Sequence, residues 1–168
     1  TSFLSVIAII FASISIASLS YSNHTVKNTY WTYGKSKNYE LYVGINKVIT
    51  TSNSVTDSFN WKNVDCSQTF YDSNYCSDCK SGVDGVSSSI IINFITLFPT
   101  ITSNLKRSTS KGDLNCTKVF TIITGIISTI TMLAALSQYQ SLCFNDLPSK
   151  GPAGDDVSYS LGPGFVCL

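Results

Sequence analysis

Six cysteines are the residues of this sequence best suited to carry out chemistry, and four of them fall into a pattern. Cys76 and Cys79 form a CxxC, Cys66 precedes Cys76 by ten residues, and Cys143 follows much later in the chain. Thiols arranged in this way can bind zinc, exchange electrons or form disulfides. The choice depends on the compartment, because thiols oxidise outside the cell and stay reduced in the cytosol.

Disulfides are the chemistry that this pattern favours. A structural zinc site needs a second pair of ligands, and the single histidine, His24, lies far from the cysteines in sequence. A redox CxxC usually opens a helix after a strand, whereas acidic residues flank this one and disfavour a thiolate. Four cysteines allow three pairings. We favour Cys66–Cys76, which would tie two neighbouring strands, and Cys79–Cys143, which would join two outer loops.

The distribution of charge places these cysteines relative to a membrane. Only 12% of the residues are charged and the net charge is +1, so the balance gives no indication of nucleic acid as a partner. Charged residues are missing from 1–26, 85–105 and 119–145. A helix of roughly 20 residues crosses a bilayer, and a soluble helix of that length normally has a charged face. Three such stretches indicate a chain that crosses the membrane several times; the alternative is a soluble protein with buried helices.

The expected fold is a membrane α-helical bundle of four spans, the last one truncated, with a small extracellular antiparallel β-sheet. The sequence lacks an initiator Met and stops within an apolar run, which is typical of a fragment. A signal peptide with small residues near its cleavage site, leaving a secreted or receptor-like ectodomain, is an alternative for the first helix. The expected parts, in order, are helix 1–21, extracellular loop 22–85, helix 86–105, cytoplasmic loop 106–118, helix 119–137, extracellular loop 138–157 and the start of a fourth helix at 158–168.

Orientation follows from the short loop between the second and third expected helices. Lys106, Arg107, Lys111 and Lys118 outnumber Asp113 there, and the positive-inside rule places such a loop in the cytoplasm. Residues 22–85 and 138–157 then lie outside. The sequon that begins at Asn23 is on that side and is the expected glycosylation site.

Residues 29–62 have the pattern of β-structure. The segment 39–46 alternates apolar and polar side chains with a period of two, and β-branched and aromatic residues are frequent throughout. Turn-forming residues separate the runs. We therefore expect an antiparallel sheet of three or four strands resting on the outer ends of the helices.

The arrangement resembles the claudin-like superfamily, which includes claudins, the peripheral myelin protein, calcium-channel gamma subunits and amastins. In that family a tryptophan precedes two cysteines about ten residues apart, and here Trp61 precedes Cys66 and Cys76. Trp31, in the aromatic strand after the first helix, also fits. Cys79 and Cys143 are additional to the family pattern. The resemblance implies four spans, a long first outer loop, a short cytoplasmic loop and a shorter second outer loop, without specifying an activity.

We expect a non-enzymatic protein without cofactor or metal, because His24 is isolated and the apolar stretches contain no ionisable residue. It would present its disulfide-stapled β-surface to other membrane proteins, in adhesion, scaffolding or a homo-oligomer, in the plasma membrane or another membrane of the secretory route. An auxiliary subunit of a channel or pump is the alternative. The tyrosines expected to supply contact area, or else to fill the core or lie at the membrane interface, are Tyr30, Tyr33, Tyr42, Tyr71 and Tyr75.

Overall fold

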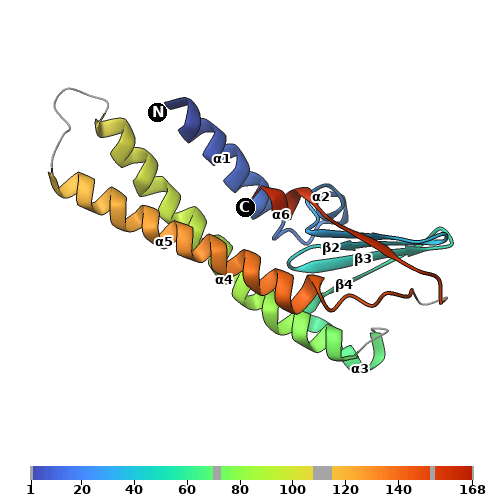
Figure 1. The fold of residues 1–168 in the computed structure, drawn as a ribbon. Coiled ribbons are helices and arrows are strands. Elements are labelled where there is room, and N and C mark those ends of the chain that lie inside the picture. Colours follow the sequence, from blue (N-terminus) through green and yellow to red (C-terminus); the bar gives the residue numbers. More distant parts are fainter. Residues whose placement is uncertain (1, 70–72, 108–114, 152–153, 168) are drawn as a thin grey trace.

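A long helical hairpin carries a β-sheet at one end, with a third helix alongside (Figure 1). This structure is a computed structural model, and it describes residues 2–69, 73–107, 115–151 and 154–167 of the 168-residue chain. The hairpin consists of α4 (Ser73–Arg107) and α5 (Asn115–Tyr139), and α1 (Ser2–Ala17) is the third helix. Residues 108–114, most of the basic loop that was used to orient the chain, lie outside the described residues.

The sheet has five antiparallel strands, one or two more than the sequence predicted. Their order is β4-β3-β2-β1-β5, so four consecutive strands form a meander and the last strand of the chain joins at the β1 edge. The strands are β1 (Thr32–Lys35), β2 (Tyr39–Val43), β3 (Lys47–Ser52), β4 (Val55–Asn60) and β5 (Ser158–Leu161).

Short helical pieces connect the sheet to the long helices. A π-helical turn extends α5 outward, and a one-turn helix follows β5 beside the end of α1 (Figure 1). These pieces are α2 (Asn23–Asn28), the 3-10 turn η1 (Trp61–Asn63), α3 (Cys66–Thr69), the π-helical turn η2 (Gln140–Phe144) and α6 (Pro163–Val166).

The β3–β4 hairpin turns through two residues with left-handed backbone conformations. Asn53 has φ 48° and Ser54 has φ 70°. Two-residue hairpin loops with positive φ at both positions match the right-handed twist of the strands that they join. Asn tolerates this conformation well, whereas Ser adopts it less readily than Gly. This turn sets the register in which Ser52 faces Val55 and Lys47 faces Asn60.

The core lies between the inner face of the sheet and the outer turns of the hairpin. On α4 its buried residues recur at helical spacing, and they face buried strand residues such as Leu41 and Val48. This packing explains why α4 begins at Ser73 and not at residue 86, where the charge-free stretch begins. The outer turns of α4 are a core helix of the extramembrane part, so they tolerate charged residues on their other face. The buried positions are Tyr75, Cys76, Cys79, Val83, Val86 and Ile90.

Two helical segments are long and apolar enough to cross a membrane, Ser73–Ser103 and Lys118–Phe144. Only 11% of the most apolar window of each is buried inside the structure, whereas the core helix of a soluble protein is mostly buried. Such exposed apolar surface indicates a membrane protein. Helix α1 has 16 residues, which at 1.5 Å per residue gives a length of about 24 Å.

The expected start of a fourth helix at 158–168 takes a different form. Residues Ser158–Leu161 pair with β1 as an edge strand, and helical structure begins only at Pro163. At Gly164 a Cβ would lie 2.4 Å from the carbonyl oxygen of Thr29 and 2.5 Å from the Trp31 ring, so only glycine allows this close approach. Local sequence does not reveal this strand, because its partner β1 lies more than a hundred residues away in the chain.

Candidate functional site: the outer surface of the sheet

The four outer cysteines form two disulfides under the sheet. Cys66 bonds to Cys76, and Cys79 bonds to Cys143. These are the two pairs that the sequence favoured, but the elements that they join differ from those expected. The first links α3 to α4 and the second links α4 to η2, because the segments taken as strand and loop are helical. Together they join the first turns of α4 to the segment before it and to the end of α5.

The two tryptophans of the family-like pattern are buried and structural. The Trp31 indole N–H donates to Ser18 Oγ at 3.0 Å, and its ring packs edge-on against Tyr139 at 4.7 Å. The Trp61 indole N–H donates to the Gly44 carbonyl at 3.1 Å. Trp31 therefore connects the end of α1, the start of β1 and α5. Trp61 instead bonds to the turn between β2 and β3.

Three of the tyrosines expected to supply contact area form one cluster on the outer face of the sheet. Ring centroids of Tyr33 and Tyr42 are 4.9 Å apart, and Tyr30 lies 5.6 Å from Tyr42. Antiparallel pairing places Tyr33 opposite Tyr42, so both point to the same face. Tyr75 is buried in the core, 2% exposed, and Tyr71 lies outside the described residues.

Charged side chains complete this tyrosine cluster, and sequence reasoning missed them. Glu40 accepts hydrogen bonds from the hydroxyls of Tyr33, at 3.2 Å, and Tyr42, at 3.3 Å, one on each carboxylate oxygen. Lys27 Nζ lies 5.4 Å above the Tyr42 ring as a cation–π contact. Glu40 alternates with the apolar residues of its strand, so its outward direction could have been read from the period of two.

The cluster also holds its tyrosines in the neutral form. Partial burial, followed by the hydrogen bond to Glu40, raises the pKa of Tyr33 to about 12. Burial and the Glu40 carboxylate also raise the pKa of Tyr42. At neutral pH the surface therefore presents phenol hydroxyls fixed by one carboxylate, which suits hydrogen bonding and stacking and offers no nucleophile.

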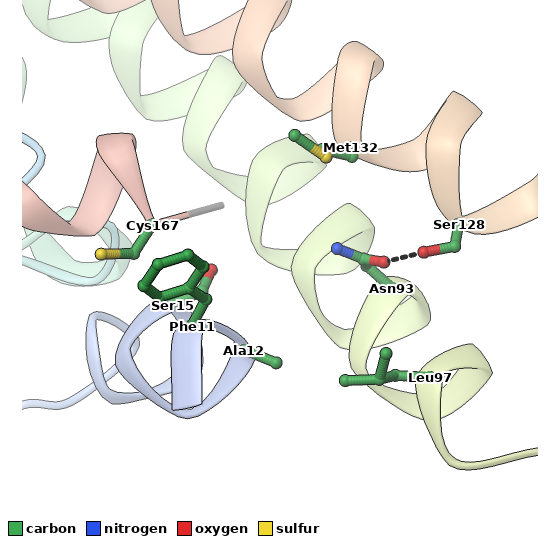
Figure 2. A pocket seen from close by; sticks show the side chains of 8 residues that line it. All are labelled: Phe11, Ala12, Ser15, Asn93, Leu97, Ser128, Met132 and Cys167. Carbon is green, nitrogen blue, oxygen red and sulfur yellow. Dashed lines mark hydrogen bonds between the residues drawn. The ribbon is translucent and has the colours of Figure 1, made fainter. Parts of the chain in front are cut away.

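A cavity of about 210 Å³ lies between α1 and the apolar part of the α4–α5 hairpin (Figure 2). Asn93 of α4 accepts a hydrogen bond from the Ser128 hydroxyl of α5, and the amide nitrogen of Asn93 is left facing the cavity. Ser15 lines the α1 side, is 2% exposed, and has no hydrogen-bond partner for its hydroxyl. A polar group without a partner is costly in this setting, so the cavity suits an apolar segment that carries a hydrogen-bonding side chain.

A groove along the outside of α5 is lined by small residues and isoleucines. Thr121, Gly125 and Thr129 form the stripe that the sequence indicated, and a Cβ added at Gly125 would meet nothing within 4 Å. Ile122, Ile126 and Ile130 border it. Small residues at a spacing of four let two helices approach closely in lipid.

The remaining predicted site residue is exposed and outside the clusters above. Asn23 begins α2, at the surface beside the sheet. Across the described ranges, no three His, Cys, Asp or Glu side chains gather in a group that could hold a metal ion.

Comparison with known proteins returns no match, either among protein-family models or among curated sequences.

Proposed function

We propose that this chain is a multi-pass, non-enzymatic membrane protein that uses the outer face of its β-sheet to contact other proteins in the same or an apposed membrane. The observation that supports this proposal is the tyrosine cluster of Tyr30, Tyr33 and Tyr42 around Glu40. Tyrosines bury a large area with little loss of side-chain entropy, and they are enriched at protein interfaces. The disulfides under the sheet fit a protein of the secretory route.

Rigidity of this surface also supports a role in contact. One carboxylate, that of Glu40, holds the hydroxyls of Tyr33 and Tyr42, and the sheet beneath packs on a buried core that includes disulfide-bonded cysteines. A preorganised surface loses less entropy on binding than a mobile one. Adhesion, membrane organisation and scaffolding are the roles that require such a surface without any catalytic group.

Photo-crosslinking on intact cells tests the proposal. A photoreactive amino acid at Ser160, which faces Tyr33 across the β1–β5 pair, should form adducts with neighbouring proteins. Replacing Tyr33 and Tyr42 by Ala should lower the adduct yield at least tenfold, since interface hot spots of this kind contribute about 2 kcal/mol. The matched control is Tyr21→Ala, an exposed tyrosine outside the cluster. Equal yields from parent and double variant would refute the proposal.

The proposed membrane arrangement is a bundle of four spans, of which α1, α4 and α5 supply three. The cavity beside Ser15 and Asn93 has the size and polarity to receive a side chain of a further apolar helix. Helix α6 lies at the mouth of this cavity, where Cys167 forms part of the lining (Figure 2). The claudin-like resemblance proposed from Trp61, Cys66 and Cys76 is consistent with the same arrangement.

An auxiliary subunit of a channel or another membrane complex is the second candidate. The groove of Thr121, Gly125 and Thr129 on the lipid-facing side of α5 favours it. Native co-purification with Gly125→Leu separates the two functions. Loss of a stoichiometric multi-span partner in this variant supports the subunit role, whereas loss of contacts only in the tyrosine variants supports the role proposed first.

A further inference from the structure

The two edges of the sheet differ in how well they are protected. At one edge β5 has four residues and is followed directly by Gly162 and Pro163, which end it. At the other edge β4 has six residues, Val55–Asn60, and no other strand of the described chain pairs with its outer side. Residues 55–58 are all exposed. Natural proteins usually guard such an edge with Lys, Pro or a bulge. Asp57 is the one charged residue in β4, and the strand has no Pro.

The register shows which backbone groups face outward along β4. In an antiparallel hairpin, alternate residues bond to the neighbouring strand and the residues between them turn their N–H and C=O away. The Trp61 N–H bonds to the Asn46 carbonyl at 3.1 Å, so the residues at even spacing from Trp61 face β3. The backbone groups of Thr56, Ser58 and Asn60 therefore point to the open edge.

We propose that a second copy of this chain adds to this edge, β4 against β4 in antiparallel orientation, about a two-fold axis that passes through Ser58. In that register Ser58 lies opposite Ser58 of the second copy, and Thr56 lies opposite Asn60. Every outward-facing residue of the strand is then paired, and each pair exchanges both of its backbone hydrogen bonds. The two sheets become one continuous sheet.

Repulsion between like charges favours this register over the adjacent one. A shift by one pair would place Asp57 directly opposite Asp57 of the second copy, and like charges in that position are destabilising. With the axis through Ser58, Asp57 instead lies opposite Phe59. Side-chain direction also excludes a shift by a single residue, because a continuous sheet must keep the tyrosine clusters of both copies on the same face. This inference rests on the proposed contact function and names its partner as the chain itself.

Cysteine scanning across the edge tests the register. In a background of Cys116→Ser and Cys167→Ser, which removes the free thiols, mild oxidation of Ser58→Cys in native membranes should give a disulfide-linked dimer. Facing residues of a hydrogen-bonded pair have Cα atoms about 5.5 Å apart, within the range that a disulfide spans. Thr56→Cys alone should stay monomeric, whereas Thr56→Cys with Asn60→Cys should dimerise. We expect at least a tenfold difference in dimer yield between Ser58→Cys and Thr56→Cys.

Equal dimer yields from Ser58→Cys and Thr56→Cys would indicate random collision and overturn the inference. So would a monomeric Ser58→Cys. A second variant, Ser58→Pro, removes an outward N–H but no bond to β3, so the sheet should persist while the Thr56→Cys/Asn60→Cys dimer is lost. Persistence of that dimer would also contradict the register. If Ser58→Cys fails while the photo-adducts at position 160 still depend on Tyr33 and Tyr42, the self-pairing is wrong and the contact function stands.

Discussion

The part of the molecule that contains the sheet and the membrane part differ in where they place apolar side chains. Around the sheet, residues such as Val43, Ile45 and Val48 are at most 1% exposed. Along α5 large apolar residues are exposed, including Ile122 and Ile130, each 61%. Large exposed apolar residues outside α1, α4 and α5 are few among the described residues. The first part is stabilised by its own core, whereas the second depends on lipid to cover it.

The hydrogen-bond partners of polar side chains differ between the two parts as well. On the membrane helices, hydroxyls mostly return to the backbone of their own helix; Thr131, for example, donates to Ile127 and Ser128. In the sheet, polar side chains bond between strands, as Tyr33 does to Glu40. Without water, a hydroxyl satisfied within its own helix is the low-energy arrangement. A contact surface therefore forms more readily on the sheet, where polar groups point outward.

Removing the disulfides should have the largest effect, and it should fall on the sheet part. The chain-entropy relation gives about 4 kcal/mol for Cys79–Cys143, which spans 64 residues, and about 3 kcal/mol for Cys66–Cys76, which spans 10. Paired Cys→Ser variants, measured by thermal unfolding in detergent with near-UV circular dichroism, should therefore rank in that order. A larger loss for the Cys66–Cys76 variant would contradict the ranking.

A charge substitution sharpens the contrast between the two kinds of exposed apolar residue. Ile130→Lys places a charge near the middle of α5, where membrane insertion should become less favourable by about 3 kcal/mol. Val55→Lys, at a similarly exposed position of 63% in β4, should leave insertion unchanged. Glycosylation-reporter or protease-protection assays measure the inserted fraction. If both variants insert equally well, α5 does not lie in lipid.

Alkaline pH should destabilise the sheet part before the membrane helices. Burial raises the pKa of Tyr39 to about 12, and burial with the Glu40 hydrogen bond raises that of Tyr33 to about 12, against 10.0 in the unfolded chain. Because the folded state favours the neutral form, this stabilisation is complete below pH 10 and is lost as pH rises toward 12 and beyond. Tyrosinate absorbance and circular dichroism should show a late titration coupled to loss of the sheet. Titration of all nine tyrosines in a single step near pH 10 would contradict it.

The smallest predicted effect concerns the β3–β4 turn. Ser54→Gly should stabilise the sheet by about 0.5–1 kcal/mol, since glycine adopts positive φ without steric cost. The matched variant Ser52→Gly, in the adjoining strand, should destabilise by a similar amount. Thermal unfolding of the two variants in parallel gives the difference. Destabilisation by both would contradict the prediction, because it would show that the added entropy of glycine in the unfolded chain outweighs the relief of positive φ at position 54.

Local pattern predicted much of this fold. The alternation at 39–46 and the turn residues at 52–54 identify the meander, and absence of charge at 119–145 locates α5. The tyrosines were recognised from composition, which left open whether they form a surface or fill the core, and the preferred cysteine pairs followed from compartment and spacing. These features depend on neighbours in sequence or on the solvent.

Features set by distant contacts were harder to predict. Strand β5 pairs with β1 across more than a hundred residues, and its four residues, Ser-Tyr-Ser-Leu, give no local sign of that partner. The early start of α4 did leave a sign, because Tyr75, Cys79, Val83 and Val86 keep a helical period. Asp78 and Asp84 also lie in this segment, so a prediction based on charge-free stretches places the start of the helix too late. Glu40 was missed because its role exists only once two strands are paired.

Helix α4 runs without interruption from Ser73, under the sheet, to Arg107, and passes through Pro99 on the way. Its outer turns pack against the sheet through the buried core, and two disulfides join those turns to α3 and η2, so we expect the sheet to move with it as one body. Helices tilt when the hydrocarbon layer becomes thinner. A change in bilayer thickness would therefore change the angle between the β4 edge and the membrane plane, so the self-pairing proposed above should depend on lipid composition.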